Sequence, residues 1–223
     1  MRRKKLILPL IPIIFFLISC STAPIVKEPQ RLREGFIIKT VALIPLHFET
    51  EYVEGSQAAE EEKEPVIPRF QKDVFLTRLL YREMVSNLDV EVIPIEKTSS
   101  EFNTIVSESP GAGFREVAIK VGEKLGAQAV LVGSLDKYQE REGGEYGVFS
   151  PASVAFYLEL LSVPEGVLLW QSYYAETQRP LLEDVTRIGR FFKRGGKWLT
   201  ADELAREGVQ DVVSKLRIFL SKG

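Results

Sequence analysis

The first half of the chain alternates apolar runs with polar segments in a way that predicts strands and helices in turn. Residues 36–48 (FIIKTVALIPLHF) are almost continuously apolar and rich in β-branched side chains, which is typical of a strand buried on both faces. Between Phe70 and Leu88, apolar residues recur every three or four positions and predict an amphipathic helix. A short strand is expected over 90–95, and a second helix over 114–125, ended by Gly126.

The second half predicts a meander of strands and a last helix. A buried strand begins at Ala127 and becomes polar toward Glu142, and apolar residues alternate again from Val154 to Leu160. The tetrapeptide 163–166 (VPEG) places proline and glycine where a turn favours them, so a β-hairpin is expected with a returning strand that reaches about residue 178. Thr200 and Glu203 have the spacing of a capping box in front of a helix that continues to the carboxyl terminus.

Two polar segments interrupt these elements and are expected to be loops. Residues 49–65 contain seven glutamates and almost no large apolar side chain, and such dense like charges repel, which favours a solvated acidic loop. Residues 97–113 are rich in serine and glycine. The order strand, helix, strand, helix, meander, helix predicts the α/β fold class, as a single α/β sandwich with a mixed sheet.

The amino-terminal twenty residues predict export. Arg2, Arg3, Lys4 and Lys5 precede thirteen residues, 6–18, that are apolar and twice interrupted by proline, which is too short for a membrane-spanning helix of about 20 residues and typical of a cleaved signal peptide. The run ends in Leu17, Ile18, Ser19 and Cys20, which resembles the lipobox of bacterial lipoproteins. That resemblance implies that Cys20 receives a diacylglycerol, that the chain is cut before it and that the new amino terminus is acylated.

A lipid at Cys20 sets the expected domain organisation and location. Residues 1–19 would be the signal peptide, 20–35 a lipid-anchored tether and 36–223 a single α/β domain containing the acidic loop. Several acyl chains retain a protein on a bilayer more durably than one does. Ser21 after the cysteine, in place of aspartate, resembles the outer-membrane sorting pattern, so the expected location is the periplasmic side of the outer membrane, with retention at the inner membrane as the alternative.

Charge and composition exclude several functions. Without residues 1–19 the chain has 25 Lys and Arg against 31 Asp and Glu, an acidic balance that argues against nucleic-acid binding, which needs a clustered basic face. One cysteine and one histidine argue against a disulfide framework and a His- or Cys-rich metal site. We expect no cofactor, no metal and no small-molecule substrate.

The residues that suggest catalysis lack the partners that catalysis needs. His47 is expected at the end of the first strand, where no local pattern supplies a nucleophile or an orienting acid. Ser134 and Lys137 have the Ser-x-x-Lys spacing of penicillin-recognising enzymes, but on a strand two residues three apart are expected on opposite faces. No enzyme activity is predicted.

Two segments are more typical of protein-contact surfaces. Residues 145–151 form an expected loop that carries Tyr146 and Phe149, with a loop folded back onto the sheet as the alternative. Further on, basic and aromatic residues interleave, which suits an acidic partner, lipid head groups or cell wall, with an amphipathic cover for the sheet as the alternative. The candidate contact residues of this second segment are Arg187, Arg190, Phe191, Phe192 and Trp198.

Residues 126–181 resemble a class of Gram-negative lipoproteins in their order of motifs. The segment contains GAQAVLVG, then ASVAF, then a hairpin that closes on GVLLW. It is similar to the curli secretion lipoprotein (CsgG), the penicillin-binding-protein activator lipoprotein (LpoB) and the amino-terminal domain of the Tol-Pal translocation protein (TolB). The resemblance implies a CsgG-like or TolB N-terminal-like fold and a non-catalytic envelope protein.

Three functions remain open on this basis. The leading hypothesis is a lipid-anchored protein-binding or assembly module of the cell envelope, whose partners are a membrane, through the lipid, and an envelope protein or a second copy. The alternative is an oligomeric secretion or pore subunit of the curli-secretion type, although the extra membrane hairpins of that family are replaced here by the acidic loop. A third hypothesis is an envelope hydrolase.

Overall fold

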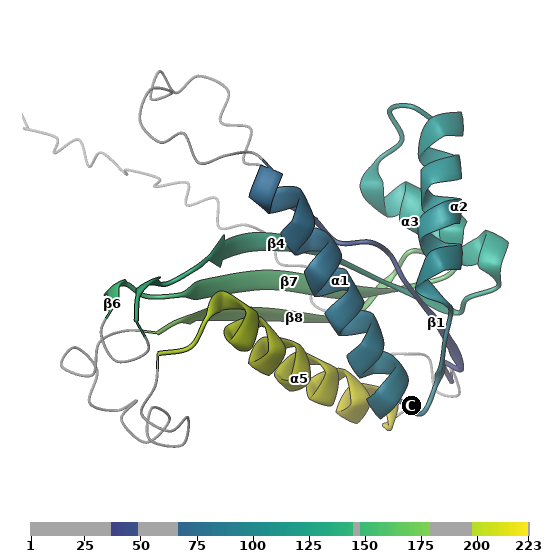
Figure 1. The fold of residues 1–223 in the computed structure, drawn as a ribbon. Coiled ribbons are helices and arrows are strands. Elements are labelled where there is room, and N and C mark those ends of the chain that lie inside the picture. The colour runs from purple at the N-terminus through teal and green to yellow at the C-terminus, as the bar shows by residue number, and fades with distance from the viewer. Residues whose placement is uncertain (1–36, 49–66, 145–147, 179–197, 223) are drawn as a thin grey trace, which may run out of the picture.

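The computed structural model describes residues 37–48, 67–144, 148–178 and 198–222. Its main sheet has the order β3-β1-β4-β7-β8, with β2 pairing β4 beyond the end of β1. Strands β1, β2, β3 and β4 pair in parallel, whereas the β4–β7 and β7–β8 pairs are antiparallel. The predicted α/β fold with a mixed sheet is therefore confirmed (Figure 1).

The main sheet is six-stranded, and a short ribbon lies apart from it. The strands of the main sheet are β1 (Thr40–Leu43), β2 (His47–Phe48), β3 (Glu91–Val92), β4 (Ala129–Gln139), β7 (Ser153–Ser162) and β8 (Leu168–Thr177). A separate two-stranded ribbon consists of β5 (Glu142–Gly143) and β6 (Val148–Ser150). The helices are α1 (Ile67–Asn87), α2 (Ile95–Glu108), α3 (Phe114–Leu125) and α5 (Ala201–Leu220).

Helices cover both faces of the sheet, as Figure 1 shows, and each pair of helices has its own core. Helices α1 and α5 pack together on one face over Leu131, Leu135 and Phe156. Helices α2 and α3 lie on the other face over Val130, Val132 and Leu161. They cover the end of the sheet where β4 begins. Strand β4, about 35 Å long in all at the usual rise per residue, continues beyond them.

The predicted loop over 97–113 is wrong for most of its length, because residues 95–108 form helix α2. Its serines and threonines do not break the helix, since their hydroxyls donate to carbonyls of the preceding turn: Thr104 to Ser100 at 3.0 Å and Ser107 to Asn103 at 2.8 Å. Ile105 is buried against α3 and gives the helix the packing that propensity alone does not supply.

The first strand is shorter than predicted. The apolar run 36–48 pairs as β1 over four residues, passes through Pro45 without a ladder bond, and pairs again as β2. Between the two, the Leu46 N–H donates to Thr77 Oγ1 of α1 at 3.0 Å. The interruption explains why the apolar run is longer than either strand.

Three local predictions are confirmed. Gly126 ends α3 in the left-handed conformation, with φ of 69°. Strands β7 and β8 form the predicted hairpin, closed by a hydrogen bond from the Ser162 N–H to Val167 O at 2.9 Å. Thr200 and Glu203 form the capping box at the start of α5.

Candidate interaction surface

One end of the sheet gathers contacts from four parts of the chain. We call it the hairpin end, after the β5–β6 ribbon; the turn of the β7–β8 hairpin lies at the opposite end. The hairpin end consists of the end of β4 with residues 140–141, the ribbon β5–β6, the end of β8 at residue 178, and residues 198–201 at the start of α5. Figure 1 shows the ribbon projecting at this end, beyond the start of α5. Strand β1 runs parallel to β4, so Ile37, where the described chain begins, lies toward the opposite end.

Polar contacts fix the hairpin end to α5. The Glu140 carboxylate accepts from the Ala201 N–H at 3.1 and 3.2 Å, which satisfies a backbone donor in the first turn of the helix. The Arg141 guanidinium donates to the carbonyl oxygen of Trp198. The Leu199 N–H donates to Gln178 Oε1 at 2.6 Å, so the end of β8 is tied to the turn before α5.

Phe149 stands out on this framework because 95% of its surface is exposed. It lies in β6, which pairs with β5 at Glu142 and Gly143, and Gln139 Nε2 donates to Ser150 Oγ at 3.1 Å. The predicted contact loop is therefore in part a hydrogen-bonded ribbon, and its Phe149 is not folded back onto the sheet. A large aromatic held in solvent by ordered backbone supplies apolar contact area at a small cost in entropy.

The other sequence-predicted site residues divide into two groups. The side chain of Trp198 is half-buried in the turn before α5, at the hairpin end. Cys20, Tyr146, Arg187, Arg190, Phe191 and Phe192 lie outside the described residues, as do the acidic loop and the tether. Trp198 and Phe149, separated by about fifty residues in sequence, thus belong to the same end of the molecule.

A charged cluster braces α1, β4 and α5 beside the hairpin end. Asp202 Oδ1 accepts from Lys72 Nζ at 3.1 Å and from the Tyr138 hydroxyl, and the Lys72 ammonium lies 4.7 Å from the centre of the Tyr138 ring. Burial alone would raise the pKa of Asp202, but the hydrogen bonds from Tyr138 and Lys72 outweigh it and lower that pKa. Burial, and then the hydrogen bond to Asp202, raise the pKa of Tyr138. No sequence pattern indicates this cluster, because its members come from three distant segments.

A second cluster lies on the opposite face of the sheet. Glu159 on β7 is 6% exposed, and its carboxylate oxygens lie 2.6 and 2.5 Å from Arg115 Nη2 in the first turn of α3. The Tyr157 hydroxyl donates to Glu159 at 2.8 Å and lies 2.7 Å from Gln171 Oε1 on β8. Burial, and then the bond to Glu159, raise the pKa of Tyr157 to about 12. The cluster ties α3 to β7 and β8 and pairs its buried charge.

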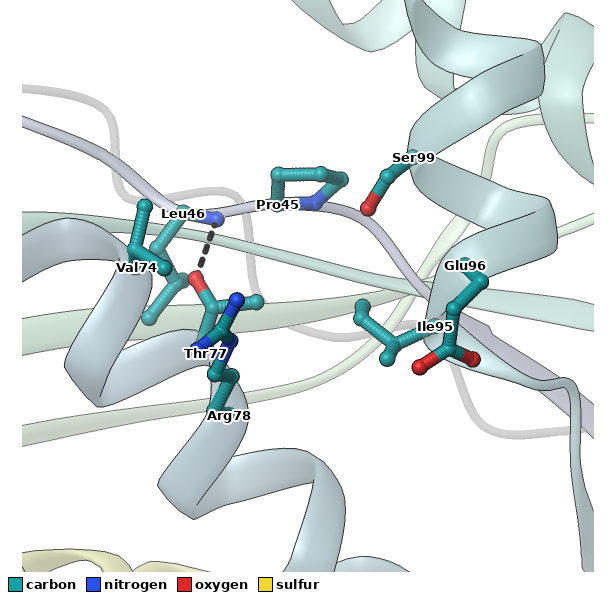
Figure 2. A pocket seen from close by; sticks show the side chains of 8 residues that line it. All are labelled: Pro45, Leu46, Val74, Thr77, Arg78, Ile95, Glu96 and Ser99. Carbon is teal, nitrogen blue, oxygen red and sulfur yellow. Dashed lines mark hydrogen bonds between the residues drawn. The ribbon is translucent and has the colours of Figure 1, made fainter.

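A small pocket opens where β1 and β3 end, as Figure 2 shows. The chain leaves β1 toward α1 and β3 toward α2, on opposite faces of the sheet, which is the switch point where open α/β sheets form crevices. The cavity measures about 290 Å³, at the lower limit for small-ligand sites. Its lining is Pro45, Leu46, Val74, Thr77, Arg78, Ile95, Glu96 and Ser99.

The lining of this pocket offers contact more than chemistry. Thr77 Oγ1 already accepts from the Leu46 backbone (Figure 2), and among the described residues no hydrogen bond joins Ser99 to Glu96 as a nucleophile and base would require. Arg78 and Glu96 are exposed on opposite walls, from α1 and α2. The pocket suits one apolar side chain flanked by charges.

The residues that suggested catalysis in the sequence have no catalytic partner within the described chain. The exposed His47 ring lies 4.3 Å from the ring of Phe114, an aromatic contact. The expectation that Ser134 and Lys137 lie on opposite faces is wrong, because a register shift between Leu135 and Lys137 turns both toward the face of Tyr157. Ser134 Oγ donates to Asp136 at 2.8 Å instead of meeting Lys137.

Neither a metal centre nor a membrane-spanning helix is present among the described residues. No group of three His, Cys, Asp or Glu side chains in this part of the chain is placed to hold a metal ion. None of the described helices is both long and apolar enough to cross a membrane.

Comparison with known proteins gives loose likenesses in fold. No family model and no curated protein matches the chain. Among solved structures, it is similar to the PelC dodecamer protein from Paraburkholderia phytofirmans, with 14% identity over 85% of this chain and 93% of that one and a TM-score of 0.44. It is also similar to the hypothetical protein CT253 from Chlamydia trachomatis, with 11% identity over 83% of this chain and 99% of that one and a TM-score of 0.46.

The carboxyl-terminal domain of LpoB from Escherichia coli is also similar, at 15% identity over 66% of this chain and 88% of that one, with a TM-score of 0.39. LpoB is one of the proteins that residues 126–181 resemble.

Proposed function

We propose that this protein is a lipid-anchored envelope lipoprotein, without catalytic activity, that binds a protein partner through its hairpin end. In this proposal Cys20 carries the lipid and residues 20–35 tether the domain to the periplasmic side of the outer membrane. The support for the anchor is the lipobox at residues 17–20. The support for the contact surface is the exposed Phe149 on the ribbon of the hairpin end.

The observation that carries the proposal is the exposure of Phe149 on a braced ribbon. Phe149 is the most exposed of the large apolar side chains of the described residues, and its place on a paired ribbon supports burial in a partner. The described chain begins at the other end of the sheet, and β4 separates the two ends by about 35 Å. Phe149 therefore lies at the end of the domain remote from the point where the tether would join it.

A photo-crosslinking amino acid at position 149 tests the contact surface. We place the photoreactive residue at Phe149 in the full-length chain, illuminate intact cells, and compare it with the same residue at Ile218. Ile218 is also a large apolar side chain, 55% exposed, but lies in the last turns of α5, far from the ribbon. We expect a discrete protein adduct from position 149 and none from position 218.

The affinity for the captured partner gives the second measurement. Phe149→Ala is expected to weaken binding by about 30-fold, the loss of a central aromatic contact of about 2 kcal/mol, whereas Ile218→Ala leaves it unchanged. Equal adducts from both positions, or a purified chain that turns over a small substrate, would overturn the proposal.

The anchor is tested separately by mass spectrometry of the amino-terminal peptide. We expect a peptide that begins at Cys20 and carries acyl chains, and Cys20→Ala is expected to release the protein from the membrane fraction. An unmodified thiol at Cys20 would refute the anchor and leave the contact surface to be judged on the crosslinks.

A further inference from the structure

The outer edge of β8 is a long strand edge. Strand β8 has ten residues, whereas β3, at the other edge of the sheet, has two. Among the described residues no strand pairs with the side of β8 that faces away from β7. Such an edge presents a row of backbone donors and acceptors that can template another strand.

The register shows which backbone groups point outward. The Gln178 N–H donates to Ala152 O at 3.2 Å, toward β7. In an antiparallel pair the direction alternates with every residue, so Glu176, Tyr174, Ser172 and Trp170 also bond inward. Residues 171, 173, 175 and 177 therefore direct their N–H and C=O groups away from β7.

The sequence of β8 itself carries little of the usual protection against pairing. Between residues 168 and 177 there is no lysine, no proline and a single charge, Glu176. The register shift in the β7–β8 pair falls between Leu160 and Leu161, near the start of β8, and leaves the segment from Trp170 to Thr177 in regular pairing. Natural sheets protect long edges with such features, so the described residues of β8 leave its outer backbone groups suited to pairing.

We propose that β8 pairs with β8 of a second copy, antiparallel, about a two-fold axis at Tyr173. Outward groups must meet outward groups, so an odd-numbered residue pairs with an odd-numbered one. The axis at Tyr173 gives an overlap of residues 170–176, all within the regular segment. In this register Tyr173 faces Tyr173 of the second copy, and Gln171 faces Ala175. Two five-stranded paths join into one continuous sheet.

The charges and the exposed side chains fit this register. Glu176, the one charged residue of the strand, lies opposite Trp170 of the second copy. The two Glu176 carboxylates therefore do not face each other, and the pairing brings no like charges together. Tyr174 points to α5, where its hydroxyl donates to Leu204 O at 3.3 Å. Tyr173 points to the other face and is 58% exposed, so it can stack against its copy without disturbing the helix.

Disulfide crosslinking tests the register directly. A directly opposed hydrogen-bonded pair places its Cα atoms about 5.5 Å apart, within the range for a disulfide. We introduce Tyr173→Cys into the full-length chain in its membrane, with the parent chain, which contains only Cys20, as the baseline. We expect a covalent dimer on mild oxidation of Tyr173→Cys.

The matched control is Ala175→Cys on the same edge. In the proposed register the two copies of residue 175 are separated by four residues along the strands, about 14 Å, which is too far for a disulfide. Crosslinking of Ala175→Cys but not of Tyr173→Cys would overturn the register.

Sedimentation of the detergent-solubilised chain tests the dimer without cysteines. We expect a dimer, a rise of about tenfold in its dissociation constant for Tyr173→Lys, which sets like charges opposite each other, and little change for Tyr173→Phe. Val106→Lys adds the same charge to the exposed face of α2 and should leave the dimer intact. A monomer, a ring of more than two copies, or a strand of another protein on β8 would overturn the proposal. None of these results depends on Phe149 or on its partner.

Discussion

The hydrogen bond between Thr77 and the break in the first strand allows a sharp test of the fold. Thr77 is 5% exposed and Leu46 is also 5% exposed, and the Leu46 N–H donates to Thr77 Oγ1 at 3.0 Å, beside the pocket of Figure 2. Thr77→Val keeps the shape of the side chain but removes the acceptor. The buried N–H then has no partner, which costs about 1–3 kcal/mol.

Thermal unfolding of the two matched variants measures this cost. At about 2–4 °C per kcal/mol for a domain of this size, Thr77→Val should lower Tm by roughly 2–12 °C. Thr77→Ser keeps the acceptor and loses one methyl group, worth about 0.8 kcal/mol. If Thr77→Ser is destabilised as much as or more than Thr77→Val, the hydrogen bond is not what holds the break in the strand, and the reasoning is refuted.

Three further predictions follow from the described contacts. In denaturant unfolding, Gly133→Ala should destabilise the fold by several kcal/mol, because its new methyl group would collide with the Tyr157 carbonyl oxygen. The control Gly113→Ala meets nothing within 4 Å and should cost about 1 kcal/mol or less. The pKa of Tyr157 is raised to about 12, so the free energy of unfolding should fall as pH rises from about 10 to 12, because the phenol ionises first in the unfolded chain. Ultraviolet titration of Tyr157→Phe should lose a late tyrosine step, and an unchanged titration would contradict the assignment. Thr200→Ala should cost about 1 kcal/mol through loss of the capping box, while Thr200→Ser should recover most of it.

The parts of the fold that the sequence predicted are those governed by local spacing. Helices α1, α3 and α5, the β7–β8 hairpin and the capping box follow from apolar periodicity and from turn or cap residues a few positions apart. Helix α2 was missed because its hydroxyl side chains are typical of loops. Only the packing of Ile105 and the bonds of Thr104 and Ser107 to their own helix show why it forms.

The candidate site was predicted in part. The sequence singled out the exposed aromatic Phe149, because residues 145–151 interrupt two apolar strands. It did not show that Glu140 and Arg141 hold the start of α5, because those contacts join residues about sixty positions apart. The Asp202 cluster was missed for the same reason: each member looks like an ordinary surface residue until α1, β4 and α5 are placed together.

The sequence by itself determined the α/β class, most of the elements, the acidic balance of the chain and the expectation of a lipid at Cys20, because these depend on composition or on residues that are neighbours along the chain. Only the tertiary structure decided the strand order, the β-bulge that turns Lys137 to the face of Ser134, and which strand of the sheet is left at its edge. These depend on which distant segments bury each other's apolar faces, and a one-residue shift in pairing changes the face to which a side chain points.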